Sequence, residues 1–454
     1  MRRIKFKSGL ACLIFVALLF AAIPGLCAVT QTAVIATAAA DYSSGAHAIA
    51  SVDPVGGPRV VETEILPTIS DIGVAAYGQF FYRIEKLNAD NITKFDISDP
   101  DTVIWQYSTM DADDGDTSCN PHSMIFVSAE KAYVLRLGST KAWIVNPAAT
   151  TEDDFKIGEL DLSDYADSDG IPEMNTGVII NGKLFIIVNR LDRNNSWAPT
   201  NTAYIAVFDT STDIEIDTGI TNADGLKGIP LDIQNCSGIQ YMAGKIYVQG
   251  AGRYASSWSG TPAEYSGGII SIDPSTYETT LVLDDGDDEN HPYGNISGMV
   301  IISATKGYFV GYAGWGDNTL YSFDPSTGES VSAISGFENI SIAGMQSGVY
   351  ADNNGLVWVC NQTDARIDIL NPADDSIDES VSTDLNPLMV AFTSEGSPDD
   401  DDGDDDDDDD DDFSCFISAV GGDYQSASKY FVLGFALLGF AGFFSLIKSK
   451  INQP

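Results

Sequence analysis

Two of the three histidines of the chain, His122 and His291, have surroundings that could support acid–base chemistry. Each stands where a polar loop runs into an apolar strand, and His291 follows the carboxylates Asp287, Asp288 and Glu289. This combination would suit metal-assisted hydrolysis of a lactone, or a lyase reaction. The chain contains no Ser-His-Asp spacing and no nucleophile motif, so ordinary loop-capping histidines are the favoured interpretation.

A group of carboxylates could bind a metal ion. Asp164, Asp167, Asp169 and Glu173 stand at short, alternating spacing around Gly170. Oxygen ligands in such a pattern are what Ca²⁺ prefers, although the twelve-residue spacing of a complete calcium loop is missing. The segment predicts a Ca²⁺ site, with a solvated acidic turn as the alternative. No other cofactor is predicted.

Aromatic and basic side chains in polar loops could bind a larger ligand. Aromatic rings in such loops can serve as flat platforms for sugar rings or for a protein partner. They could instead fold back over the ends of the strands, because large aromatic side chains tend to be buried. Together with the two histidines, the predicted ligand-binding residues are Arg193, Trp197, Arg253, Tyr254, Trp258, Tyr265 and Trp315.

The elements that must position these residues are short β-strands. From Val29 to about Ser397, hydrophobicity alternates over short segments separated by Gly, Asn, Asp and Pro, which is an all-β pattern. A unit of about 40–60 residues recurs, each with two hairpins. The second hairpin turns at an Asx residue, which is followed by Pro in four of the five turns: Asn146-Pro147, Asp209-Thr210, Asp273-Pro274, Asp324-Pro325 and Asn371-Pro372. An Asx side chain caps such a turn, and Pro fixes φ at the next position.

The number of units follows from the two ends of this region. Six complete units run from about Asp71 to Ser382, and Asn386–Phe392 remains as a lone strand. The segments Ala33–Thr37, His47–Asp53 and Arg59–Leu66 supply the three strands that this unit lacks. Four antiparallel strands in each radially repeated unit define a propeller blade. The sequence therefore predicts a seven-bladed β-propeller whose last blade is closed by both termini.

Loop lengths predict two different faces. The turns after the first and third strands of a blade are short, as at Asn181-Gly182 and Ala243-Gly244. All long loops fall on the other face: Asp111–Cys119, Asp161–Asn175, Leu191–Asn201, Thr221–Asn235, Ala251–Gly267, Asp284–Gly294 and Tyr312–Asn318. Binding residues usually collect on the elaborated face of a rigid scaffold. The ligand site is therefore expected there.

Several motifs resemble those of one protein family. The hairpin Ile205–Thr212 and the strand opening Asn120-Pro121-His122 resemble YVTN-type bacterial surface β-propellers. The stretches Asp169–Met174 and Arg190–Asn195 resemble an exported subgroup of them. This resemblance covers nearly the whole region and implies the fold more than an activity.

The two ends of the chain predict export and membrane attachment. Residues 1–28 combine a basic start, an apolar run and a small residue, as a secretory signal does. An Asp-rich linker (398–414) follows the propeller (29–397), and an apolar run (430–447) followed by a basic tail (448–454) would anchor the chain in a membrane. Between them, residues 415–429 resemble a Cys-containing sorting signal, with Cys415 as the sorting residue.

The net charge bears on the possible partners of the protein, and the cysteine content bears on whether disulfides stabilise it. The net charge of the chain is −43, and residues 29–397 alone hold 52 acidic and 16 basic side chains, a formal −36. Nucleic acid is therefore excluded as a partner. Only Cys119, Cys236 and Cys360 fall in the propeller, which is no disulfide framework.

These observations predict an exported, membrane-anchored binding module of the cell envelope, with an envelope glycan or protein as ligand. The alternative is a Ca²⁺-dependent, lactonase-like hydrolase or lyase acting at the mouth of the propeller channel.

Overall fold

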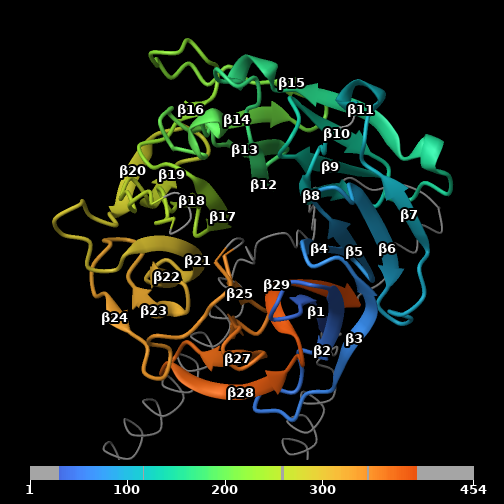
Figure 1. Cartoon of the computed structure of the whole chain (residues 1–454), viewed down its shortest axis with the longest axis vertical. Helices are drawn as coiled ribbons and strands as arrows, with labels where there is room; N and C mark the ends of the chain where they lie inside the picture. The colour runs from blue at the N-terminus through green and yellow to red at the C-terminus, as the bar shows by residue number, and fades with distance from the viewer. Residues whose placement is uncertain (1–29, 116, 257–259, 345–346, 396–454) are drawn as a thin grey trace, which may run out of the picture.

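The computed structural model describes residues 30–115, 117–256, 260–344 and 347–395, which form one ring of seven β-sheets (Figure 1). The predicted signal, linker, sorting junction with Cys415, membrane anchor and tail lie outside the described residues, as does Trp258. Within the described part of the chain, no helix is long and apolar enough to cross a membrane.

Each sheet is a four-stranded antiparallel blade, and an extra short strand, β16, pairs with β14 in the third. Blade 1 contains β4 (Ile72–Tyr77), β5 (Phe80–Glu85), β6 (Asn91–Asp96) and β7 (Trp105–Ser108). Blade 2 contains β8 (Pro121–Ser128), β9 (Lys131–Arg136), β10 (Lys141–Val145) and β11 (Lys156–Asp161). Blade 3 contains β12 (Met174–Ile180), β13 (Lys183–Val188), β14 (Tyr204–Asp209), β15 (Ile214–Glu215) and β16 (Ile229–Pro230).

Blade 4 contains β17 (Cys236–Met242), β18 (Lys245–Gly250), β19 (Gly268–Ile272) and β20 (Thr279–Leu283), and blade 5 contains β21 (Asn295–Ser303), β22 (Lys306–Gly314), β23 (Asp317–Phe323) and β24 (Ser332–Ala333). Blade 6 contains β25 (Val349–Ala351), β26 (Val357–Asn361), β27 (Arg366–Asn371) and β28 (Ser376–Ser382). Blade 7 contains β29 (Asn386–Glu395), β1 (Thr30–Ala38), β2 (Gly45–Ser51) and β3 (Val61–Thr68). The predicted seven-bladed propeller is confirmed.

The last blade closes the ring as the sequence predicts. Strand β29, from the C-terminal end of the propeller, pairs antiparallel with β1 from its N-terminal end, from Ala38↔Asn386 to Thr30↔Glu395. The pairing makes β29 the inner strand of this blade and leaves neither terminal strand without a partner. In Figure 1 the blue and orange-red ends of the colour scale meet in this blade.

The hydrophobic core lies between the blades. Inner and middle strands are covered on both faces by neighbouring blades, so a strand such as β13 is buried along nearly its whole length. Outer strands such as β11 alternate between exposed residues and residues that are partly or fully buried. Seven core clusters result, one at each interface between adjacent blades, including the interfaces on both sides of the blade that closes the ring.

The Asx turns form as predicted. In each of the five turns the side chain accepts a hydrogen bond from the backbone N–H two residues later, for example Asp209 Oδ1 from Ser211 at 2.9 Å and Asp273 Oδ1 from Ser275 at 2.8 Å. Hydrogen bonds from the hydroxyls of Ser211 and Ser275, together with these backbone hydrogen bonds, hold the pKa values of Asp209 and Asp273 below their usual range. The three propeller cysteines are buried and free, so no disulfide links the described residues.

One detail differs from the sequence-based expectations. The predicted long loop Tyr312–Asn318 is the end of a hairpin, because β22 continues to Gly314 and β23 begins at Asp317. Trp315 and Gly316 form its tip, where Gly316 takes a positive φ of 72°. Strand β25 begins only at Val349, although Ile342 already forms an isolated β-bridge with Asn361 and the N–H of Ala343 donates to the carbonyl of Cys360 at 3.2 Å.

Candidate functional site

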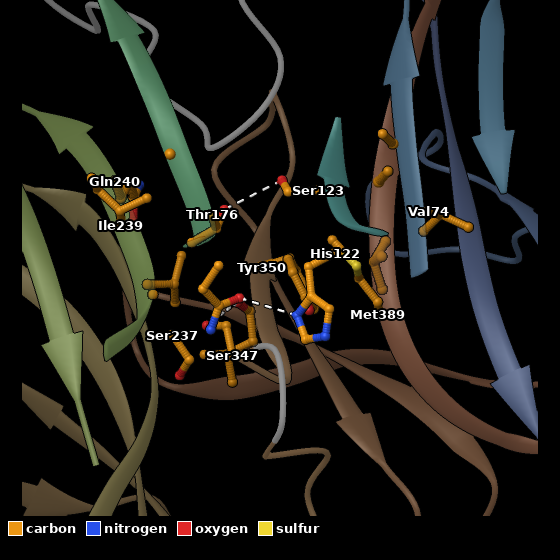
Figure 2. Close-up of a pocket in the computed structure, with 18 of the residues that line it drawn as sticks. Val74, His122, Ser123, Thr176, Ser237, Ile239, Gln240, Ser347, Tyr350 and Met389 are labelled. Carbon is orange, nitrogen blue, oxygen red and sulfur yellow. Dashed lines mark hydrogen bonds between the residues drawn. The ribbon is translucent and has the colours of Figure 1, made fainter. Parts of the chain in front are cut away.

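A cavity of about 160 Å³ lies on the propeller axis, lined by residues from the innermost strands of all seven blades. Figure 2 shows this channel cavity, with His122 on β8 and Ser237, Ile239 and Gln240 on β17. Most of its surface is apolar. The inner strands are thus close enough to fill the axis with side chains and leave little room for a ligand.

His122 is the one histidine in the channel cavity, and its protonation state follows from its neighbours. Asn175 donates through Nδ2 to the carbonyl of Cys236 at 3.2 Å, so its Oδ1 faces Nδ1 of His122 at 3.3 Å. His122 Nδ1 therefore carries the proton, and Nε2 is left as an acceptor. Burial, aided by the positive charge of Lys86, lowers the pKa of His122 to about 3. The imidazole is neutral at physiological pH and too weak a base to suit proton abstraction.

A second, larger cavity of about 420 Å³ opens above the channel on the long-loop face. Ile72 and Leu388, where β4 and β29 begin, line it, while Val74 and Met389 further along the same strands line the channel cavity. We call this cavity the mouth pocket. Its position brings together loops from blades that are far apart in the sequence.

Aromatic side chains from three blades surround the mouth pocket. Tyr42 lies between β1 and β2, Tyr254 follows β18, and Tyr312 and Trp315 belong to the β22–β23 hairpin. The rings of Tyr42 and Trp315 meet edge to face with centroids 6.3 Å apart, and those of Tyr254 and Tyr312 meet similarly at 4.8 Å. Trp315 is 77% exposed and Tyr42 43% exposed. Exposed rings of this kind are available to stack on a ligand.

Three polar side chains in the lining of the mouth pocket, those of Lys86, Asp71 and Asn318, could form charged or hydrogen-bonded contacts with a ligand. Lys86, directly after β5, is buried, and its Nζ lies 3.9 Å from Oδ1 of the half-exposed Asp71. Burial lowers the pKa of Lys86 to about 8, and Asp71 offsets this only in part. Asn318 is also buried, and its Oδ1 accepts from the backbone of Ile342 at 2.8 Å. Its Nδ2 has no hydrogen-bond partner among the described residues.

The predicted ligand-binding residues separate into different places. Tyr254 and Trp315 line the mouth pocket, and His122 lines the channel cavity. Tyr265 stacks on His291 with centroids 4.0 Å apart, and neither lines either cavity. Arg253 forms a backbone bridge with Glu264, and its Nε donates to the carbonyl of Pro262 at 3.3 Å. The structure thus assembles only part of the predicted set.

Arg193 and Trp197 belong to a separate cluster outside both cavities. The guanidinium of Arg193 lies 4.8 Å from the ring centroid of Trp197, and its Nε donates to Oε1 of Glu173 at 2.7 Å. Glu173 is fully buried, and burial raises its pKa to about 8 while the adjacent Arg193 lowers it in part. These contacts hold the loop after β13 against the loop before β12, and we call this arrangement the clamp. Arg193 and Trp197 therefore already have partners within the protein.

Three of the four carboxylates of the predicted Ca²⁺ site, those of Asp167, Asp169 and Glu173, belong to this clamp. Asp167 accepts from Asn201 Nδ2 at 2.6 Å, and Asp169 accepts from the backbone N–H of Arg193 at 2.8 Å. Asp164 lies in a short 3₁₀ turn, Ser163–Tyr165. Within the described ranges, no three His, Cys, Asp or Glu side chains are arranged to hold a metal ion. Calcium binding at this loop stays a prediction, and it would require the clamp to rearrange.

The mouth pocket contains residues that the sequence reasoning missed. Tyr42 stands in the short polar turn Asp41–Gly45, so the criterion applied to the other loop aromatics could have found it. Tyr312 falls within a loop that the sequence did single out. Lys86 and Asn318 carry no such signal, because their burial depends on blades that meet only in the closed ring.

Comparisons with known proteins support the fold alone. No protein-family model matches the chain, and a search of curated proteins finds no match either. Among solved structures, it is similar to a putative 6-phosphogluconolactonase from Bacteroides uniformis, with 12% identity, a TM-score of 0.53 and coverage of 80% of this chain and 99% of that one. The chain is also similar to a protein from Lactobacillus plantarum, with 13% identity, a TM-score of 0.53 and coverage of 80% of this chain and 99% of that one. The fold implied by the YVTN resemblance is confirmed, while membership of that family is not shown.

Proposed function

We propose that this protein is a ligand-binding β-propeller of the cell envelope and that the mouth pocket binds a saccharide. One observation carries the proposal: Tyr42, Tyr254, Tyr312 and Trp315 surround a single cavity at the channel mouth. Aromatic rings offer flat apolar faces to sugar rings, and the polar groups between them can bind hydroxyls. Export and membrane anchoring rest on the sequences of residues 1–28 and 430–447.

The size of the pocket favours a small ligand over a protein partner. Its volume of about 420 Å³ is in the range of small-molecule sites, which is roughly 300–1,000 Å³. A stable protein interface instead buries on the order of 1,000 Å² or more over a broad surface. One or two sugar units, or the end of a longer glycan, match the pocket better.

Binding of neutral and acidic saccharides to the full-length protein tests this proposal, with the protein held in a detergent that has no sugar headgroup. Trp315→Ala should weaken binding about tenfold, the cost of losing one stacking surface. Trp197→Ala removes a 47% exposed tryptophan outside the pocket and should leave binding unchanged. Equal affinity of the parent and Trp315→Ala proteins would refute the site. Turnover of a lactone or uronide, abolished by His122→Ala, would favour the enzymatic alternative.

A further inference from the structure

Lys86 is a buried cation without a close partner. Its side chain is 6% exposed, and the nearest carboxylate oxygen, Oδ1 of Asp71, lies 3.9 Å away, beyond hydrogen-bond distance. No described residue accepts a hydrogen bond from its Nζ. A buried ammonium has three N–H donors, and leaving them unsatisfied is costly. Its place in the lining of the mouth pocket makes a ligand the natural source of acceptors.

The backbone around Lys86 holds this side chain in place. The N–H of Lys86 donates to the carbonyl of Asp71 at 3.0 Å, and the carbonyl of Lys86 accepts from Ala89 and Asp90, both at 2.9 Å. The carboxylate of Asp90 in turn accepts from the backbone N–H of Asn120 in the next blade at 2.7 Å. A cation whose backbone is fixed at both ends loses little further freedom when a ligand binds.

Asn318 provides a second unsatisfied donor in the same pocket. It is 2% exposed, and the N–H of Ile342 occupies its Oδ1, which leaves Nδ2 as the group without an acceptor among the described residues. Two donors lacking acceptors, one of them charged, match a ligand that offers oxygen atoms and a negative charge. Lys86 is the only basic side chain in the lining and Asp71 the only acidic one.

We propose that the ligand of the mouth pocket carries a carboxylate that binds Lys86, so that the pocket selects an acidic sugar over its neutral counterpart. This inference rests on the proposed saccharide site. The acidic surface of the propeller does not prevent it, because at about 0.15 M salt charges beyond roughly 8 Å are screened. A carboxylate hydrogen-bonded to Lys86 would be closer to the ammonium than the solvated Asp71 is.

The test compares D-glucuronate with D-glucose, which share a ring and differ at one carboxylate, on the full-length protein. The parent should bind glucuronate about tenfold more tightly, the effect of one charge-assisted hydrogen bond. Lys86→Met should abolish this preference, because neither sugar can then form the charge-assisted hydrogen bond. Lys245→Met makes the same change in net charge at an exposed lysine outside the mouth pocket and should keep the preference.

A second measurement on the parent protein avoids any substitution. Acetylation of each lysine is followed by mass spectrometry, and glucuronate but not glucose should protect Lys86. The inference is overturned if Lys86→Met retains the preference, or if glucuronate neither binds better than glucose nor protects Lys86. Binding of glucose that depends on Trp315 would then leave the proposed saccharide site intact. Binding of neither sugar would refute both proposals.

Discussion

At the scale of single residues, burial of carboxylates without full hydrogen bonding is the clearest feature. Asp285 is completely buried, and its Oδ2 accepts from the N–H of Gly267 at 3.2 Å. Its Oδ1 has no hydrogen-bond partner in the described part of the chain. Burial, together with the negative charges of Asp284 and Glu264, raises the pKa of Asp285 to about 7, although the hydrogen bond from Gly267 lowers it in part. Ionisation of this side chain therefore opposes folding.

We expect Asp285→Asn to stabilise the protein above neutral pH. The native pKa is raised to about 7 from 3.8, so the native state holds the proton more tightly than the unfolded state. Stability contributed by the protonated form is complete below about pH 4 and is lost as pH rises through about 7. The gain in melting temperature over the parent should grow between about pH 5 and about pH 8. The exposed Asp153→Asn, which removes one carboxylate far from Asp285 in the sequence, is the control, and a pH-independent difference for Asp285→Asn would contradict the assignment.

At the scale of elements, polar contacts join neighbouring blades on the short-turn face. Asp375, in the turn between β27 and β28, accepts from Tyr308 and pairs with Lys306 at 2.7 Å, both on β22 of the preceding blade. Asp213 does the same for Tyr133 at 2.5 Å and Lys131 at 2.8 Å. The repeated arrangement fixes the turn of one blade against the strand of the blade before it.

A double-mutant cycle measures this contact. Asp375→Asn keeps a side chain that tolerates the positive φ of 59° at this position, while it removes the charge. Asp375→Asn and Tyr308→Phe should each lower the free energy of unfolding by about 1 kcal/mol, and the two losses should not add. Denaturant unfolding gives the values. Strict additivity would show that the hydrogen bond contributes nothing between the blades.

The clamp between two long loops leads to a second prediction at this scale. Arg193→Ala removes the hydrogen bond from Arg193 to the buried Glu173 and should cost about 1 kcal/mol. If the loop instead rearranges around Ca²⁺, the parent should melt higher in Ca²⁺ than in Mg²⁺ at matched ionic strength. A joint Asp167→Ala and Asp169→Ala variant would then lose this difference. Equal melting temperatures in the two ions would rule out the calcium site.

At the scale of the whole molecule, closure of the ring depends on residues far apart in the sequence. Arg59, between β2 and β3, pairs with Glu379 at 2.8 Å and with Asp378 at 3.1 Å on β28, and its side chain is fully buried. The contact fastens the blade built from both termini to the sixth blade. The β29–β1 pairing and the two adjacent core clusters complete the closure.

Deletion of residues 29–66 should therefore open the ring. The variant keeps six blades but exposes β29 as an unpaired strand, so we expect aggregation or loss of cooperative unfolding. Arg59→Ala is the milder test and should cost roughly 3 kcal/mol, because two carboxylates lose their buried cation. Size-exclusion chromatography and thermal unfolding report both effects. A monomeric truncation as stable as the parent would show that the closing blade is dispensable.

Much of the architecture could be predicted from the sequence, because it depends on local properties. Alternating hydrophobicity marked the strands, and the Asx residues at Asp209, Asp273 and Asp324 marked the turns, since their side chains bond to backbone only two residues away. The count of seven followed from the same periodicity. The extent of the β22–β23 hairpin did not, because Tyr312, Ala313 and Trp315 could equally lie in a loop.

The candidate site was decided by the tertiary structure. Tyr42, Tyr254 and Trp315 come from the seventh, fourth and fifth blades and surround one pocket only because the closed ring directs their loops over the same axis. Lys86 is an ordinary lysine in the sequence, and it is buried in the lining of that pocket, to which residues of several blades contribute. The residue types available for binding are a property of the sequence. Which of them share a cavity, and which are held by structural partners as Arg193 is, depends on contacts between distant segments.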